Sequence, residues 1–250
     1  FIENIWDSID CLIINCRRDQ TSVFELIESR DHGFDVLNIY DFDSCIPEYK
    51  HPELIKYKDI HKGERCFIIG NGPSLLLDDL EKLERHNEIT FAFNMIYKIF
   101  DRVSWRPTYY GISDGLIYED CFDMLDQIEC KKMFLTDEYH RDTCIIKEGA
   151  EYFHYNVREY VPCHPRFSDD ITNEVCWGRS VIYDMGLQFA IYMGFSQIYL
   201  MGCDHSYSND VTESTNHFIP DYFGKDKEKK YTIFEYESKK VELAFETAKK

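Results

Sequence analysis

The run R-C-F-I-I-G-N-G-P-S, from Arg65 to Ser74, narrows the fold more than any other part of the chain. Its apolar residues 66–69 are typical of a parallel strand that is covered on both faces. The glycines allow a sharp turn and a close backbone approach to a ligand, and the proline and serine suit a helix start whose amides point toward an anion. The run therefore predicts a phosphate or nucleotide site, with an ordinary strand-to-helix turn as the alternative. The residues assigned to this site are Gly70, Asn71, Gly72, Pro73 and Ser74.

Strands and helices are expected to alternate along the rest of the chain. We expect strands at 89–94, 107–112 and 197–201, and helices at 78–86 and 180–193. This alternation predicts an α/β fold with a Rossmann-like, doubly wound and mostly parallel sheet. Residues 1–60 look different and are expected to form a small N-terminal accessory segment, so that residues 61–250 form the nucleotide-binding domain.

Polar residues follow several of the expected strands. In an open parallel sheet, ligands bind beyond the carboxyl ends of the strands, where Asn94, Asp114 and Asp204 stand in this sequence. Each aspartate could bind a sugar hydroxyl, bind Mg²⁺ or merely cap the next turn. Gly178 and Ser180, before the long helix, form a further candidate site of amide and hydroxyl donors, and an ordinary helix start explains them equally well.

The composition limits what the chain can bind. With 250 residues, 44% of them hydrophobic and 16% aromatic, it can bury a sizeable core as one domain. Its formal net charge of -18 argues against binding to nucleic acid or to an anionic membrane surface. Ten cysteines without a C-x-x-C pair indicate reduced thiols in a cytoplasmic protein. No signal peptide or membrane-spanning stretch is visible, and we expect both ends to continue beyond Phe1 and Lys250.

Taken in order, the motifs between residues 61 and 224 resemble two related groups of proteins. These motifs are G-N-G-P-S at 70–74, F-N at 93–94, G-F at 194–195, I-Y-L-M-G-C-D at 198–204 and N-H-F at 216–218. One group is the bacterial sialyltransferases of glycosyltransferase family 42. The other is domain-of-unknown-function family 115, which includes motility-associated flagellin glycosylation proteins and archaeal 6-hydroxymethylpterin pyrophosphokinases. The ordered combination is far more specific than any single motif.

The resemblance implies a GT-A-like variant of the α/β fold and an inverting glycosyltransferase that uses a CMP-activated nonulosonic acid, such as sialic acid. It implies that Asn71, Gly72, Ser74 and Asn94 hold the nucleotide and its phosphate. Because a CMP-linked sugar leaves with a single phosphate, amides and hydroxyls can stabilise the departing charge, and we expect no obligatory metal or cofactor. The expected acceptor is a glycan, a lipid-linked glycan or a protein, in bacterial lipopolysaccharide, capsule or glycoprotein synthesis at the inner face of a membrane.

The resemblance also suggests which residues carry out the chemistry. His217, in the N-H-F motif, is the expected general base, because an imidazole titrates near neutral pH and can take the proton of an acceptor hydroxyl. His205, next to Asp204, is the competing residue. The resembling sialyltransferases use tyrosine hydroxyls after the I-Y-L strand to assist the leaving group, which points to Tyr207, although its register is shifted.

Two other functions stay open. The archaeal relatives suggest diphosphate transfer from ATP to a pterin alcohol, which requires Mg²⁺ and would use Asp114 and Asp204 as its ligands. The third possibility is a non-catalytic scaffold that keeps a nucleotide site and acts in surface-polysaccharide assembly. The sequence contains no motif that identifies the sugar, the acceptor or the oligomeric state.

Overall fold

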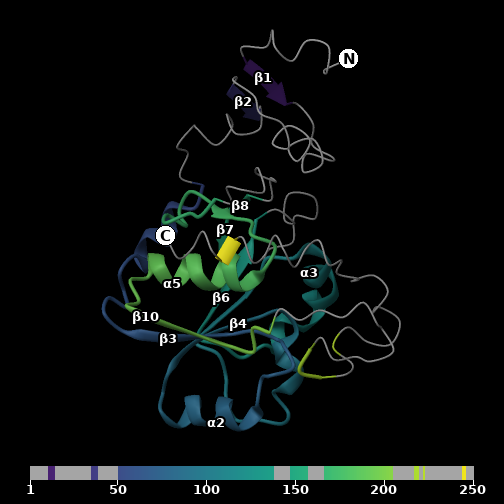
Figure 1. Cartoon of the computed structure of the whole chain (residues 1–250). Coiled ribbons are helices and arrows are strands. Elements are labelled where there is room, and N and C mark those ends of the chain that lie inside the picture. The colour runs from purple at the N-terminus through teal and green to yellow at the C-terminus, as the bar shows by residue number, and fades with distance from the viewer. Residues whose placement is uncertain are drawn as a thin grey trace.

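A computed structural model describes residues 11–14, 35–38, 50–137, 147–156, 166–204, 217–219, 222 and 244–245. At its centre is a six-stranded parallel sheet, which confirms the expected α/β class (Figure 1). In order across the sheet, the strands are β10 (Gln197–Met201), β3 (Arg65–Ile69), β4 (Ile89–Phe93), β5 (Tyr109–Ile112), β6 (Lys132–Thr136) and β7 (Glu151–Phe153). Two short parallel pairs lie outside this sheet: β1 (Cys11–Ile14) with β2 (Asp35–Asn38), and β8 (Tyr155–Asn156) with β9 (Val175–Cys176).

The order of the strands reverses at β3. From β3 to β7 each new strand adds to the same side of the sheet, whereas β10, the last in sequence, pairs with the opposite side of β3. The register of that pair sets Tyr199 opposite Phe67. Such a reversal is where open α/β sheets bind their ligands, because the connections that follow the two strands leave toward opposite faces. The doubly wound prediction is confirmed, and the turns after β3 and β10 meet at this switch point.

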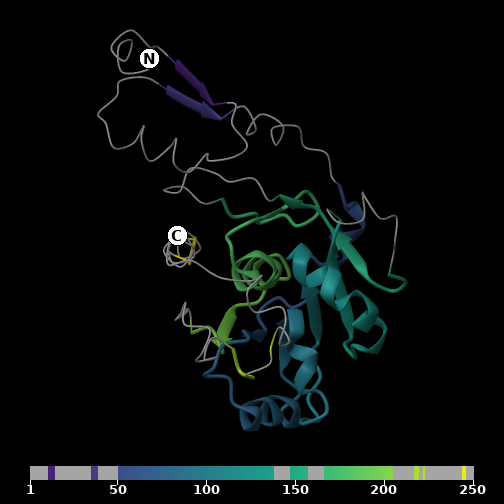
Figure 2. The ribbon, with the colours of Figure 1, turned by 90° about the vertical axis from the view of Figure 1, so that its right-hand side faces the viewer.

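Helices lie on both faces of the sheet. The α-helices are α2 (Leu77–Arg85), α3 (Gly115–Cys121) and α5 (Gln188–Tyr192), and the π-helical segment η7 (Ile182–Leu187) leads directly into α5. The 3₁₀ segments are η4 (Pro52–Tyr57), η5 (Asn94–Ile99) and η6 (Phe122–Gln127). Figure 1 shows α2 on one side of the sheet and α5 on the other, and Figure 2 shows the green helix, α5, along its axis.

Alternation along the strands supplies two apolar clusters, one on each face. Successive strand residues point to opposite sides, so Ile69 joins the cluster of Leu80 from α2, while Ile68 joins the cluster of Phe189 from α5. Gly186 lets η7 lie close to the sheet, because a Cβ at this position would stand 2.8 Å from Cγ2 of Ile68. The helix expected at 180–193 is therefore present, but its first part is π-helical.

Residues 50–60 pack onto this body. Leu54 of η4 is fully buried in the same cluster as Phe134, and the amide of His61 donates to the carbonyl of Met193 at 2.9 Å. The division at residue 60 into an accessory segment and a nucleotide-binding domain stays a prediction. The cysteines that the structure describes as free thiols are Cys66, Cys121, Cys130, Cys176 and Cys203.

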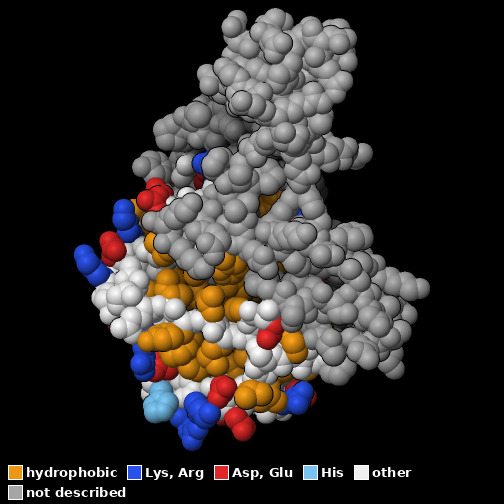
Figure 3. Space-filling model, in the orientation of Figure 1, with side chains coloured by type: hydrophobic (Ala, Val, Ile, Leu, Met, Phe, Trp, Pro, Cys, Tyr) orange, Lys and Arg blue, Asp and Glu red, His pale blue; other side chains and the backbone are white. Residues whose placement is uncertain are grey.

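The surface over α5 and β10 is rich in apolar side chains (Figure 3). Ile191, Tyr199 and Leu200 are each more than 40% exposed, at 41%, 44% and 43%. None of the helices in the described ranges has the length and apolar character needed to cross a lipid bilayer.

Candidate functional site

The turn that follows β3 lies directly against the end of β10. The amide of Gly70 donates to the carbonyl of Met201 at 2.7 Å, and the amide of Gly72 donates to the carbonyl of Gly202 at 2.8 Å. A Cβ at Gly70 would lie 2.4 Å from the Gly202 oxygen, and one at Gly72 would lie 2.0 Å from Oδ2 of Asp204. Both glycines are therefore required by the close approach of the two turns.

Asp204 closes the turn from the other side. Its Oδ2 accepts a hydrogen bond from the amide of Ser74 at 3.1 Å. Helix α2 begins only at Leu77, so Pro73 and Ser74 belong to the turn before the helix. The sequence predicted that backbone amides of this turn would bind a phosphate. The amides of Gly70, Gly72 and Ser74 instead donate to residues 201–204, at and just after the end of β10. The side chains of the turn and of its neighbours are left to recognise a ligand.

Asn71 has an amide group that is held from two directions. Its Nδ2 donates to the carbonyl of Phe93 at 3.1 Å and to the hydroxyl of Tyr222 at 2.6 Å. Its Oδ1 is buried and has no hydrogen-bond partner among the described residues. A buried carbonyl oxygen without a donor costs about 1–3 kcal/mol, and a ligand that donates a hydrogen bond would remove this cost.

Asn94 offers the same kind of acceptor at the end of the next strand. It follows β4 in a left-handed conformation, with φ of 54°, which asparagine tolerates better than most residues. Its backbone carbonyl accepts a hydrogen bond from the Tyr110 hydroxyl, whereas its Oδ1 is buried without a partner in the part of the chain that is described. Within the described ranges, the ends of β3 and β4 thus present two carboxamide oxygens that lack a partner. Ribose hydroxyls and the amino group of a nucleobase are donors that match them.

His217 lies in a segment that contacts Asn71. The amide of Phe218 donates to the carbonyl of Asn71 at 3.0 Å, and the His217 ring stacks on Tyr222 with centroids 3.9 Å apart. Burial lowers the pKa of His217 to about 4, so its imidazole is neutral at physiological pH and able to accept a proton. Residues 205–216, which include the predicted Tyr207 and the competing His205, lie outside the described residues.

A second polar group lies at the end of β5. Fully buried Asp184, on η7, accepts hydrogen bonds from the amide of Gly178 at 2.6 Å and from the hydroxyl of Tyr155 at 2.5 Å. Burial raises the pKa of Asp184 to about 8. Asp114 caps α3 by accepting from the amide of Ile117 at 3.3 Å. The amide of Gly178 is therefore engaged by a protein carboxylate, and the carboxylate of Asp114 is engaged by the start of α3.

The positions of Asp114 and Asp204 bear on metal binding. They follow β5 and β10, which are three places apart in the sheet. At about 4.8 Å per strand, the two strands that they follow are roughly 14 Å apart, whereas two oxygens on one Mg²⁺ lie only about 3 Å apart. The strand order therefore gives no support to a shared ion at these two carboxylates. In the described ranges, no group of three or more His, Cys, Asp or Glu side chains could hold a metal ion.

A network of hydrogen-bonded polar side chains joins the ends of β6 and β7 to residues 50–53. Asp137 faces Nδ1 of His154 at 3.2 Å and Nε2 of His51 at 3.3 Å, and Lys50 donates to Nε2 of His154 at 3.3 Å. The other nitrogen of His51, Nδ1, lies 3.0 Å from Oε1 of Glu53. Sequence reasoning missed this network, because no motif connects its members.

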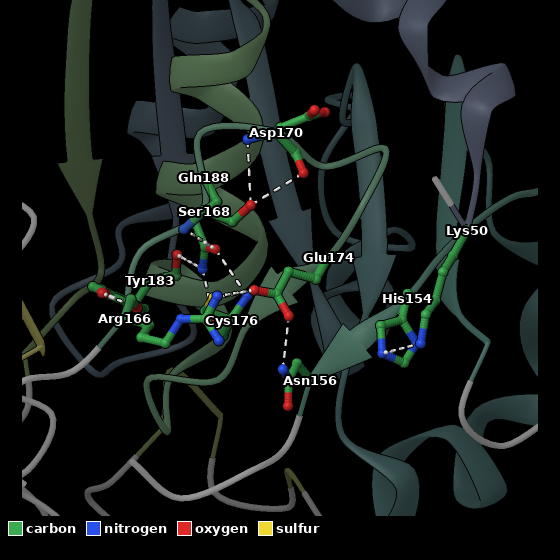
Figure 4. Close-up of polar contacts among 10 residues, drawn as sticks. All are labelled: Lys50, His154, Asn156, Arg166, Ser168, Asp170, Glu174, Cys176, Tyr183 and Gln188. Carbon is green, nitrogen blue, oxygen red and sulfur yellow. Dashed lines mark hydrogen bonds and ion pairs between the residues drawn. The ribbon is translucent and has the colours of Figure 1, made fainter. Parts of the chain in front are cut away.

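Nearby, side-chain hydrogen bonds hold the β8–β9 pair onto η7 and α5 (Figure 4). Gln188 donates to the carbonyl of Cys176 at 2.8 Å and accepts from the Cys176 amide at 2.9 Å. Glu174 accepts from Asn156 at 2.7 Å and also pairs with Arg166. Because both Gln188 and Glu174 have protein partners, we interpret this region as structural support.

Sequence comparison gives the family. Residues 42–210 match the family described as MptE-like, 6-hydroxymethylpterin diphosphokinase MptE-like. The chain belongs to this family. The match spans both turns of the switch point, from before Gly70 to beyond Asp204. It agrees with the resemblance to domain-of-unknown-function family 115 that the sequence motifs carry.

Comparison with solved structures returns the MAf glycosyltransferase from Magnetospirillum magneticum AMB-1. The two chains are 14% identical and superpose with a TM-score of 0.41, over 76% of this chain and 37% of the other. This chain thus spans little more than a third of the length of that protein. A similarity at this level gives no evidence about the fold or the chemistry of this chain. Among curated proteins, no significant sequence match is found.

Proposed function

We propose that this protein is a glycosyltransferase that moves a nonulosonic acid from a CMP-activated donor to a glycan or protein acceptor, with inversion. The observation that carries the proposal is the pair of carboxamide oxygens, on Asn71 and Asn94, that have no partner among the described residues at the switch point of the sheet. These acceptors suit the hydroxyl and amino donors of a nucleoside. The neutral imidazole of His217 stacks on Tyr222, whose hydroxyl accepts from the amide of Asn71.

In the proposed reaction, His217 removes the proton of the acceptor hydroxyl as that oxygen attacks the anomeric carbon. The bond between this carbon and the phosphate oxygen breaks, and CMP leaves with both bonding electrons. A base of low pKa is a weak one, but it stays in the proton-accepting form at every pH above about 4. Protonation of the departing CMP by Tyr207 remains part of the proposal.

Diphosphate transfer from ATP to a pterin alcohol is the second candidate, and the description of the family favours it. This reaction needs Mg²⁺ to bridge phosphate oxygens. Asp114 and Asp204, its expected ligands, follow strands that are three places apart in the sheet, so each would bind the ion together with oxygens of the nucleotide. The CMP-sugar reaction makes no such demand, and it gives His217 a role.

Calorimetric titration with CMP and with ATP, each with and without Mg²⁺, separates the two candidates. We expect CMP to bind without metal. Asn94→Gly should weaken CMP binding about 3- to 10-fold, the equivalent of one hydrogen bond. Glycine removes Oδ1 and also tolerates the left-handed backbone of this position. Asn173→Ala, on the loop before β9, is the control and should bind like the wild type.

The outcomes point in different directions. ATP binding that depends on Mg²⁺, without CMP binding, would replace the proposal by the diphosphokinase. If neither nucleotide binds, the proposed nucleotide site is refuted, whereas nucleotide binding without either transfer reaction favours the scaffold function. If CMP binds, release of CMP from CMP-N-acetylneuraminic acid in the presence of acceptor sugars tests the chemistry, and His217→Asn should abolish it.

A further inference from the structure

Tyr222 touches both parts of the proposed site. This tyrosine is only 4% exposed, and it lies 151 positions along the chain from Asn71, whose amide donates to its hydroxyl at 2.6 Å. The ring of Tyr222 stacks on the imidazole of His217, with centroids 3.9 Å apart and planes inclined by 9°. One side chain thus contacts both the expected nucleotide-binding amide and the expected base.

The hydroxyl of Tyr222 determines how the amide of Asn71 is oriented. An asparagine amide has two N–H donors, and here they face the Tyr222 hydroxyl and the carbonyl of Phe93. With both donors engaged, Oδ1 has one direction left, and in that direction it is buried without a partner in the described part of the chain. Without the hydroxyl, one hydrogen bond would hold the amide, and Oδ1 would no longer be aimed at the ligand.

The ring of Tyr222 acts on His217. A near-parallel stack at this distance covers one face of the imidazole and keeps water away from it. Tyr222 is itself well anchored, since its carbonyl accepts from Nζ of Lys98 at 2.5 Å and its hydroxyl accepts from the amide of Met95 at 3.4 Å. Lys98 is the charged group that these contacts place beside the stack.

We propose that Tyr222 is a positioning residue of the transferase site, with its hydroxyl aiming the amide of Asn71 at the nucleotide and its ring holding the imidazole of His217 in place. This inference rests on the proposed function. The two effects depend on different parts of one side chain. Phenylalanine at this position would keep the ring and lose the hydroxyl, whereas leucine would lose both.

The test compares Tyr222→Phe, Tyr222→Leu and the control Tyr199→Phe, in which the altered tyrosine is on β10 and 44% exposed. CMP affinity is measured by calorimetry. The titration of His217 is followed by NMR of its ring protons, assigned with a His217→Asn spectrum. We expect Tyr222→Phe to weaken CMP binding about 3- to 10-fold and to leave the low pKa of His217 unchanged.

Tyr222→Leu should weaken CMP binding and also raise the pKa of His217 toward its ordinary value of 6.5, because water reaches the imidazole. A Tyr222→Phe protein that binds CMP like the wild type would refute the role of the hydroxyl. An unchanged His217 titration in Tyr222→Leu would refute the role of the ring. If Tyr222→Leu does not fold, Tyr222→Phe still decides the first point. A wild type that binds no nucleotide defeats the proposed function instead, so the two failures are distinguishable.

Discussion

Replacing Gly72 by alanine would force a methyl group into the contact between the two turns of the switch point. Its Cβ would lie 2.0 Å from Oδ2 of Asp204 and 2.7 Å from the carbonyl oxygen of Gly202. The Asp204 carboxylate would have to move, which breaks its hydrogen bond from the Ser74 amide. The backbone would also have to separate, which breaks the 2.8 Å hydrogen bond from Gly72 to Gly202.

The cost follows from these contacts. Two lost hydrogen bonds contribute about 2 kcal/mol, and the remaining overpacking adds about 1–2 kcal/mol. We therefore expect Gly72→Ala to lower the free energy of unfolding by about 3–4 kcal/mol. Gly63→Ala is the matched control: Gly63 has φ of 84° and no neighbour within 4 Å of an added Cβ. Its cost should be only the backbone strain, about 1 kcal/mol.

These costs are measured by urea denaturation. The proteins compared are the two glycine variants, the Asp204→Ala variant, and a double variant that carries both Gly72→Ala and Asp204→Ala. Removing the carboxylate removes the shortest contact, so Gly72→Ala should cost at least about 1 kcal/mol less in the Asp204→Ala protein than in the wild type. Equal costs for Gly72→Ala and Gly63→Ala, or strict additivity in the double variant, would refute the steric argument.

Two further predictions concern buried carboxyl groups. Burial of Asp137 opposes its ionisation, but hydrogen bonds from His154 and His51 outweigh burial and lower the pKa of Asp137. The ionised carboxylate therefore stabilises the fold above its unfolded pKa, and this stabilisation is lost as the pH falls. Asp137→Asn should make the free energy of unfolding depend less on pH in the acid range. Asp184, with its pKa raised to about 8, has the opposite sign and costs stability as the pH rises from about 4 to 8. Asp184→Asn should remove that slope, and Asp184→Ala, which removes the acceptor of both the Tyr155 hydroxyl and the Gly178 amide, should cost about 2–4 kcal/mol by thermal unfolding at pH 6.

The fold class could be predicted because its signals are local. The apolar run 66–69, the glycines after it and the spacing of the next strands specify parallel strands with helical connections, and the structure confirms each of these elements. A signal for Asp184 was also present: this carboxylate stands in an otherwise apolar helical stretch, and it is fully buried. Such a position indicates a paired or neutral acid.

The nature of the candidate site depended on contacts that no local pattern encodes. Sequence alone established that a tight glycine turn follows a buried strand, and it named Asn71 and His217. Only the tertiary structure decided that the turn donates its amides to the end of β10 and that Tyr222 lies between Asn71 and His217. The partners in the hydrogen bonds from Ser74 to Asp204 and from Asn71 to Tyr222 are 130 and 151 positions apart. Strand order brings such residues together, whereas strand and turn propensities act over a few neighbours.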